Sequence, residues 1–324
     1  MSFPQLSVII TNYNHARYLP TCLQAVLDQS VQPHEIIVID DASTDHSVEV
    51  IDGFARRHPL IRFYRNKENQ GVVWGMNRGL DLARGDYIYY AAADDQILPG
   101  FFEKSLGLLR QYPQAALSCT IGDWWEVATG LNWHVAVSMT ESAGFIAPAE
   151  MVRLEREGKL YIASHAAIMR REAILEADKF LPEFKWFCDW FAIYVAGFRH
   201  GICFVPEPLA QFNIHRASYY KSGARTPRAH RDVLQKMLDR LNQKELQDVE
   251  PLIRESGALF IFGLPVLQVL LRQTAYRRYL TPAFLWKNLW HITKLQLKKA
   301  TPSFLGNWYF RISGYRARAP VPPA

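Results

Sequence analysis

The sequence has few cysteines and no pairing pattern among them. The four cysteines lie far apart, form no CxxC pair and combine with no histidine at the spacing of zinc ligands. These absences argue against a disulfide framework or a structural zinc site as the basis of the fold. The chain opens on an apolar, strand-like segment rather than on a basic leader with a cleavage site, so we expect a reducing, cytoplasmic setting.

A hydrophobic run long enough to cross a bilayer is also missing. The longest apolar stretch covers residues 258–271 and is interrupted by Pro265 and Gln268. A membrane-spanning helix needs about 20 apolar residues in a row. The stretch therefore predicts a buried or interfacial helix.

Acidic residues are missing from the last part of the chain. Glu255 is the last Asp or Glu, whereas ten of the 37 Lys and Arg lie from Arg272 onward. This asymmetry indicates an anionic partner (lipid head groups, nucleic acid or a phosphorylated acceptor) or else a solvated basic surface. The basic, aromatic-rich helices predict peripheral contact with the inner face of a membrane. The alternative is packing against the rest of the chain or against a second copy in a homo-oligomer.

No glycine-rich phosphate loop follows the first predicted strand. The segment "TNYNHARYL" (11–19) contains no glycine. It therefore lacks the GxGxxG of dinucleotide-binding dehydrogenases and the glycine-rich, basic loop with which a sugar-phosphate nucleotidyltransferase would open. Both enzyme classes are discounted on this ground, the nucleotidyltransferase being the nearer alternative.

Short buried strands alternate regularly with helices in the first 120 residues. Apolar runs predict strands at 6–11, 35–40, 61–65, 86–92 and 115–119, with helices at 15–29, from about Ser43, at 71–83 and at 99–111. This alternation predicts an α/β fold with a mostly parallel sheet covered on both faces. In such sheets ligands bind beyond the carboxyl ends of the strands.

The alternation ends after residue 120. The later pattern predicts a hairpin over 122–137, helices at 148–157, 171–177 and 186–201, an extended segment at 202–215 and one long amphipathic helix from Arg228 to Ile253. A polar segment with Gly223 and Pro227 separates the two regions. We predict a catalytic domain at 1–220 and a helical, basic C-terminal extension at 221–324.

Polar side chains cluster where the predicted strands end. Asp94 and Asp95 are adjacent, and like charges at close range raise each other's pKa unless a cation or strong donors hold them. A Mg²⁺ or Mn²⁺ ion that shares its ligands with substrate phosphates would suit this pair. The alternative is a helix N-terminal cap, since a helix is predicted from Pro99. Asp41 has two similar interpretations, as an acceptor for a nucleobase N–H or as a capping residue.

Three segments, 6–51, 69–95 and 188–215, together resemble family 2 glycosyltransferases in order and spacing. Their central motifs are "IITNYN", "IDDASTD", "AAADD" and "CDW". The resemblance covers roughly residues 5–216 and implies a GT-A fold, a Rossmann-like nucleotide-diphospho-sugar transferase fold. It also implies inverting transfer of a sugar from a nucleotide-diphospho-sugar, with UDP expected, to an acceptor hydroxyl. Mn²⁺ or Mg²⁺ would serve as cofactor, the acceptor would be a glycan or lipid-linked molecule in polysaccharide, glycan or glycolipid assembly, and no nucleic acid is expected.

The resemblance also assigns roles to individual residues. The donor-binding positions are Thr11, Asn12, Tyr13 and Asp41 for uracil and ribose, Asn77 and Arg78 for the diphosphate side, and Asp94 for ribose or sugar. Asp95 and His215 match metal-binding positions, and Asp189 matches the catalytic base. The sequence departs from the family pattern at Ala92, where the metal motif often begins with Asp, and at Cys188, where an acid often precedes the base.

Two alternatives remain open at this point. Asp189 lies between aromatic residues, where desolvation would raise its pKa and strengthen it as a base, but it also stands where a helix cap would. The whole chain could be a non-catalytic scaffold of a glycan-assembly complex with the same fold. The retention of Asp41, Asp94, Asp95 and Asp189 together argues against the scaffold.

Overall fold

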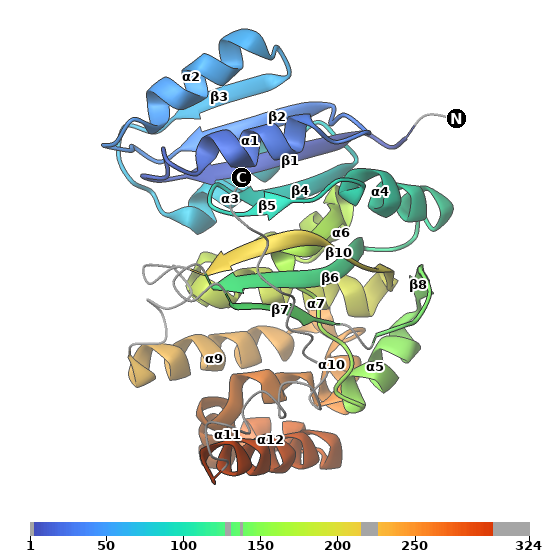
Figure 1. Cartoon of the computed structure of the whole chain (residues 1–324). Coiled ribbons are helices and arrows are strands. Elements are labelled where there is room, and N and C mark those ends of the chain that lie inside the picture. The colour runs from blue at the N-terminus through green and yellow to red at the C-terminus, as the bar shows by residue number, and fades with distance from the viewer. Residues whose placement is uncertain (1–2, 127–130, 137–138, 215–225, 301–324) are drawn as a thin grey trace.

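A sheet of ten strands runs through the part of the chain that the structure describes (Figure 1). The structure is a computed structural model, and it describes residues 3–126, 131–136, 139–214 and 226–300. The strand order is β3-β2-β1-β4-β9-β6-β10-β5, with β7 paired to β6 and β8 to β10. The predicted α/β fold with a mostly parallel sheet is confirmed.

The N-terminal half of the sheet is parallel, as the strand–helix alternation predicts. Its elements are β1 (Leu6–Asn12), α1 (Leu19–Leu27), β2 (Glu35–Asp40), α2 (Ser47–Arg57), β3 (Ile61–Arg65), α3 (Val72–Leu82) and β4 (Tyr87–Ala92). β1 lies between β2 and β4 and pairs in parallel with both. Each helix provides the crossover that a parallel pair requires.

The other half of the sheet is mixed. Its elements are β5 (Gln96–Ile97), α4 (Phe101–Gln111), β6 (Leu117–Glu126), β7 (Leu131–Val135), β8 (Gly144–Ile146), β9 (Ala167–Arg170) and β10 (Ile202–Ile214). β6 and β10 are parallel, and β9 runs antiparallel between β4 and β6, joining the two halves. The predicted hairpin is confirmed as β6–β7, with Trp124 opposite Trp133.

Two hydrophobic cores lie on opposite faces of the sheet. Side chains alternate along β1, so that Val8 and Ile10 join the core under α1, α2 and α4, while Ile9 joins the core under α3 and α7. Gly79 lets α3 approach closely, because a Cβ there would lie 2.3 Å from Cγ2 of Ile9. The close approach holds α3, and the loop before it, beside the carboxyl end of β1.

The remaining helices extend the second core away from the sheet. They are α5 (Pro148–Arg156), α6 (Arg171–Glu176), α7 (Cys188–His200), α9 (Pro227–Leu241), α10 (Glu250–Ser256), α11 (Gly263–Arg272) and α12 (Pro282–Ala300). Buried residues from α3, α7 and α9 through α12 belong to one continuous cluster. The predicted domain boundary at 220/221 falls in 215–225, outside the described residues, so the division into two domains stays a prediction.

Two predicted helix boundaries are wrong. The helix expected over 228–253 ends at Leu241, where its buried stripe ends, and a short turn at Lys244–Leu246 precedes α10, whose first turn contains Pro251. The helix expected from Ser43 begins at Ser47 instead. Ser43 does not cap it because the Ser43 hydroxyl is engaged by the β1 loop.

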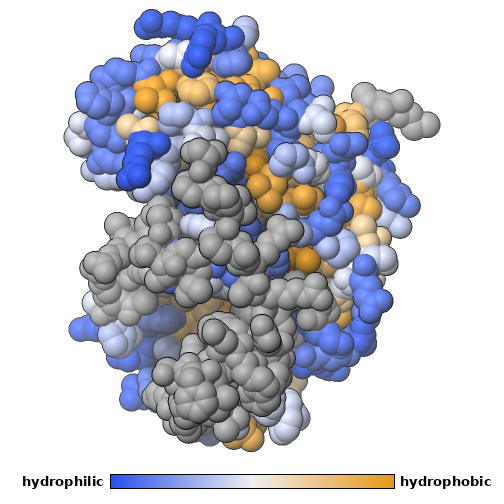
Figure 2. All heavy atoms as spheres, viewed as in Figure 1, coloured by the Kyte–Doolittle hydropathy of each residue, from blue (hydrophilic) through white to orange (hydrophobic). Residues whose placement is uncertain are grey.

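The predicted buried or interfacial helix over 258–271 is a 3₁₀ turn (Ala258–Phe262) followed by α11, with Val266 and Leu270 buried. Within the described residues, no single helix is long and apolar enough to cross a membrane. In the same residues, one pair of helical segments, α10 and 258–272, reaches that length and apolar composition together, but the two segments are bent by 65° relative to each other. In the view of Figure 2 the described surface is a patchwork in which hydrophobic residues emerge in small groups between hydrophilic ones.

A buried ion pair fastens α12 to α5. Lys287 donates to the carboxylate and the carbonyl of Glu155, and both side chains are almost fully buried. Burial lowers the pKa of Lys287 and raises that of Glu155, and the pairing of the two charges opposes both shifts. The Lys287 ammonium also lies 3.9 Å from the ring centroid of Phe260.

Lys287→Met should lower the free energy of unfolding by about 3–5 kcal/mol, because it leaves the Glu155 carboxyl buried without its partner. Urea denaturation followed by circular dichroism measures the change. The double variant Glu155→Leu/Lys287→Met is the control and should recover most of the loss. Equal stability of Lys287→Met and the native chain would show that the pair does not hold α12.

Candidate active site at the carboxyl edge of the sheet

The carboxyl ends of β1, β2 and β4 bring the predicted donor-binding residues together. Thr11 pairs with Ile39 on one side and with Ala92 on the other. The loop that carries Asp41 and the loop that carries Asp94 and Asp95 therefore flank the end of β1. This arrangement confirms that the acidic clusters share one edge of the sheet.

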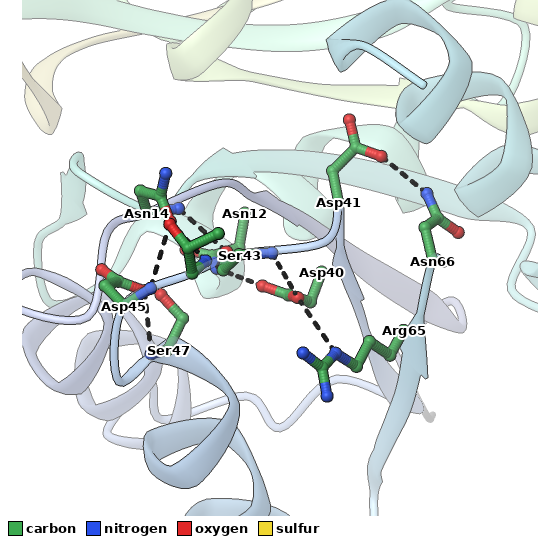
Figure 3. A network of polar contacts seen from close by, with 10 residues as sticks. Asn12, Asn14, Asp40, Asp41, Ser43, Asp45, Ser47, Arg65 and Asn66 are labelled. Carbon is green, nitrogen blue, oxygen red and sulfur yellow. Dashed lines mark hydrogen bonds and ion pairs between the residues drawn. The ribbon is translucent and has the colours of Figure 1, made fainter. Parts of the chain in front are cut away.

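A hydrogen-bond network fixes the loops after β1 and β2 (Figure 3). The amide of Asn12 donates to Asp40 at 2.7 Å and to the Ser43 hydroxyl at 3.1 Å, and the backbone N–H of Asn14 donates to the same hydroxyl at 2.9 Å. The Oδ1 of Asn14 in turn accepts from the backbone N–H of Thr44 at 2.8 Å. Asn12 is buried in this network and acts here as a structural tie, so its contact with the donor stays a prediction.

Asp41 points away from this network, toward the loop before α3 (Figure 3). One carboxylate oxygen accepts from Asn66 and from the backbone N–H of Gln70, and the other accepts from the backbone N–H of Gly71, each at 2.8 Å. Asp41 therefore does not cap α2 but holds the approach to α3. The oxygen that accepts only from Gly71, Oδ2, keeps a further lone pair with which to accept a nucleobase N–H. Tyr13, 45% exposed at the end of β1, is open to a ligand.

A shallow pocket adjoins Asp41 along α3. It is lined by Gln70, Gly71, Val72, Val73, Trp74, Asn77, Arg78, Asp81 and Pro182. Arg78 is exposed and makes no ion pair with any residue that the structure describes, so its charge is available to phosphate. Asn77 uses both amide atoms on the backbone of Phe180, at 2.8 and 3.1 Å. Asn77 thus shapes the pocket, and its contact with the diphosphate stays a prediction.

Asp95 is a buried carboxylate that is only half satisfied. Its Oδ1 accepts from the backbone N–H of Asn213 at 2.9 Å, and the Asn213 amide donates to the carbonyl of Asp94 at 2.6 Å. Its Oδ2 is buried and has no hydrogen-bond partner among the described residues. Burial, and secondly the charge of Asp94, raise the pKa of Asp95 well above its usual value.

These features fit a divalent cation. A buried, unpartnered carboxylate oxygen beside a second, half-buried carboxylate is a hard oxygen site, and a cation would relieve the cost of burying the charge. No group of three or more His, Cys, Asp or Glu that could hold a metal occurs in the described ranges. The remaining ligands would then come from a substrate diphosphate or from His215, which lies outside the described residues.

Asp189 lies in the first turn of α7. Its Oδ1 accepts from the backbone N–H of Trp190 at 2.7 Å, and a hydrogen bond with Ser164 also lowers its pKa. Burial raises the pKa more strongly, so the net direction is upward. The helix-cap interpretation and the catalytic one are both compatible with this position, because the carboxylate accepts from a helix N–H and has a pKa raised by burial.

Asp189 and Asp95 are linked by a chain of contacts at the same edge. Ser164 and His165 form a short 3₁₀ turn before β9, which starts at the carboxyl edge because it runs antiparallel to β4. The His165 ring lies 5.2 Å from the ring of Phe212, the neighbour of Asn213 that holds Asp95. Asp189 therefore belongs to the same carboxyl edge of the sheet as the two acids that follow β4.

Sequence reasoning missed the residues that hold the acids. Asn213, Ser164 and Asn66 each bind a predicted site carboxylate or its backbone, and each comes from a distant part of the chain. The polar pair Ser164–His165 inside the apolar run "YIASHAAIM" was the one available signal. The ring of His165 is buried, and desolvation lowers its pKa to about 4, so it is neutral at neutral pH.

The sequence model of glycosyl transferase family 2 matches residues 7–176, slightly more than half of the chain. The chain belongs to glycosyl transferase family 2. The matched segment contains the β1, β2 and β4 loops with Thr11, Asp41, Asp94 and Asp95, whereas Asp189 lies beyond it. The family predicted from the sequence motifs is confirmed.

Relatives in this family share part of their length with the chain. It is 30% identical to an uncharacterized glycosyltransferase, YibD, of Escherichia coli over 151 residues, 46% of this chain and 43% of the relative. It is 25% identical to the putative glycosyltransferase EpsH of Bacillus subtilis over 223 residues, 67% and 63% of the two chains. The chain thus spans less than two thirds of the length of these relatives.

Solved structures confirm the GT-A glycosyltransferase fold. A structure of S. aureus TarS 1-349 in complex with UDP-GlcNAc superimposes with a TM-score of 0.64 at 16% identity, covering 80% of this chain and 72% of TarS 1-349. The mannosyltransferase PcManGT of Pyrobaculum calidifontis, in complex with GDP-Man and Mn²⁺, superimposes with a TM-score of 0.53 at 16% identity, covering 90% and 88%. At these identities the likeness concerns the fold.

Asp95→Asn should raise the melting temperature of the metal-free protein at neutral pH by a few degrees. The raised pKa means that the folded state binds a proton that the unfolded chain has lost, so the native protein loses stability as pH rises from the ordinary Asp pKa to the raised one. Below the ordinary pKa the two proteins should melt alike. Calorimetry across pH 3–8 in EDTA tests this, and a lower melting temperature of Asp95→Asn at neutral pH would contradict it.

Proposed function

We propose that this chain is an inverting, metal-dependent glycosyltransferase. It transfers a sugar from a UDP-sugar to a hydroxyl of a glycan or lipid-linked acceptor in polysaccharide, glycan or glycolipid assembly. The observation that supports the proposal is that one edge of the sheet carries both a half-satisfied buried acid, Asp95, and a desolvated acid, Asp189. One suits a cation with its diphosphate, and the other suits removal of a proton.

Donor binding follows from the loops after β1 and β2. Tyr13 offers an exposed ring for a base. Asp41 is held by three hydrogen bonds, and its Oδ2 keeps a lone pair to accept an N–H, which a uracil ring has and which favours UDP. The neighbouring pocket carries the exposed cation of Arg78, which is suited to a diphosphate. TarS bound to UDP-GlcNAc and PcManGT bound to GDP-Man support a nucleotide-sugar as the class of donor.

Asp95, with Asp94 beside it, would hold Mn²⁺ or Mg²⁺. When bound, such an ion stabilises the negative charge that develops on the departing diphosphate. The backbone N–H of Asn213 fixes the Asp95 carboxylate through Oδ1, which leaves Oδ2 without a partner among the described residues. PcManGT was solved with Mn²⁺, which supports a divalent cation in this fold.

Asp189 would act as the base toward the acceptor. Its pKa is raised by burial, and the N–H of Trp190 and the bond with Ser164 orient the carboxylate. As the acceptor oxygen attacks the anomeric carbon, Oδ of Asp189 takes the hydroxyl proton, and the diphosphate leaves from the opposite face. A single displacement of this kind inverts the anomeric centre.

Asp189→Asn should lower the rate of sugar transfer by roughly 10²–10⁴-fold, because the amide cannot accept the proton. Affinity for UDP, measured by calorimetry with Mn²⁺, should change little. Asp86→Asn is the matched control, since Asp86 is exposed and precedes β4 at the opposite edge of the sheet. Retention of most of the native transfer rate in Asp189→Asn would refute the role of base.

The configuration of the product distinguishes a single displacement from a double one. With an α-linked UDP-sugar that supports turnover, the new linkage should be β, which the anomeric proton coupling in NMR reveals. An α-linked product would contradict the inverting mechanism while leaving donor binding intact. Absence of both transfer and donor hydrolysis across a panel of nucleotide-sugars would favour the non-catalytic scaffold.

A further inference from the structure

Large hydrophobic side chains come to the surface mainly on the last helices. In the described part of the chain, seven such residues lie there, Ile261, Leu264, Leu271, Leu285, Trp286, Leu289 and Trp290. Only Tyr13 and Trp74 are comparably exposed elsewhere in that part, and both lie beside the donor site. A group of this kind on one region marks an interaction surface rather than ordinary scatter.

The inward side of α12 carries Phe284, Lys287 and Asn288, whereas its outward side is apolar. Lys287 and Asn288 are 6% and 5% exposed, whereas Trp286, Leu289 and Trp290 are 64%, 58% and 51% exposed. The outward residues, with Leu285, recur at intervals of one and four positions and form one stripe of the helix. The buried pair of Lys287 and Glu155 fixes this orientation, so the apolar stripe cannot rotate inward without breaking it.

A second apolar stripe lies on α11 and on the turn before it. Ile261, Leu264 and Leu271 are 43%, 55% and 55% exposed on the side of α11 and its preceding turn that faces away from the core. The start of α12 packs tightly on this region, since a Cβ at Gly257 would lie 2.8 Å from the backbone nitrogen of Phe284. Figure 1 shows α11 and α12 at the end of the molecule remote from β3 and α2.

The region is also positively charged. Arg272 and Arg277 are exposed and form no ion pair with any residue in the described ranges. The sequence contains no acidic residue after Glu255, while the basic residues continue beyond these two. An apolar stripe with tryptophans, bordered by cations, matches the head-group region of an anionic bilayer.

We propose that the outward stripes of α11 and α12 form a membrane-docking face that binds anionic lipid bilayers, with Trp286 and Trp290 inserted at the level of the head groups. A second copy of the chain fits this face less well, because a symmetric interface would bring the same cations together. The inference goes beyond the proposed glycosyl transfer and does not depend on it.

Vesicle flotation of the full chain tests the proposal. Vesicles containing phosphatidylglycerol should bind the protein, whereas pure phosphatidylcholine vesicles should bind it at least about tenfold more weakly, and added salt should weaken the anionic case. The double variant Trp286→Ser/Trp290→Ser should lose at least about tenfold in partitioning. Trp74→Ser is the matched control for a lost exposed tryptophan and should bind as the native chain does.

The double variant Arg272→Glu/Arg277→Glu tests the contribution of charge to vesicle binding. Arg56→Glu on α2 is the control, because Arg56 is a distant exposed arginine. The first should abolish the preference for anionic vesicles and the second should keep it. Circular dichroism confirms that each variant is folded. The proposal would be overturned if the native chain did not bind anionic vesicles, or if the tryptophan variant bound them as well as the native chain does. It would also be overturned if sedimentation equilibrium showed that this variant converts a native dimer to a monomer without loss of lipid binding.

Discussion

The burial of carboxylates at one edge of a parallel sheet is the constraint on which the rest of this structure depends. A buried carboxylate must be neutralised, hydrogen-bonded or paired with a cation. Parallel strands bring their carboxyl ends to a common edge, so the acids that follow β2 and β4 meet there whether or not they are satisfied by the protein. How far each one is satisfied separates a structural role from a chemical one.

The acids at this edge form a graded series. Asp40 is fully engaged by the Asn12 amide and the backbone of Ser43, and it serves to lock two loops together. Asp41 is engaged by backbone N–H groups and keeps accepting capacity. Asp95 has one oxygen without a partner among the described residues. The protein thus places its least satisfied carboxylate where a cation and a diphosphate would complete it.

The same reasoning applies to the far end of the molecule. Lys287 is buried against Glu155 and Phe260, a costly arrangement for a lysine. Because Lys287 faces inward, the apolar residues on the other side of α12 face outward, and their exposure to water is also unfavourable. A partner on the outward stripe would offset the second cost, and the proposed anionic bilayer would be such a partner.

The sequence alone predicted those elements whose structure depends on neighbouring residues in the chain. The strands and helices from β1 to β4 follow from apolar runs and helical spacing within each segment, and the acids at their ends follow from the parallel topology. β9 has only four residues and gives no periodic signal, and the long helix expected at 228–253 fails because periodicity does not reveal where a stripe stops being buried. The partners of the acids, Asn213 and Ser164, are contacts between distant segments that no local pattern encodes.

The orientation of α12 could not be predicted from the sequence either, because both of its faces carry apolar residues. The ion pair of Lys287 with Glu155, a contact between distant segments, decides which face is buried.

The central claim is that Asp95 and Asp189 face one donor site. A crystal of the protein grown with UDP and Mn²⁺ tests it most directly, through the anomalous scattering of manganese. The account predicts an anomalous peak bound to Oδ2 of Asp95 and to the diphosphate, on the side of the sheet edge where Asp189 lies. A manganese peak away from Asp95, or a diphosphate screened from Asp189 by the sheet, would contradict it.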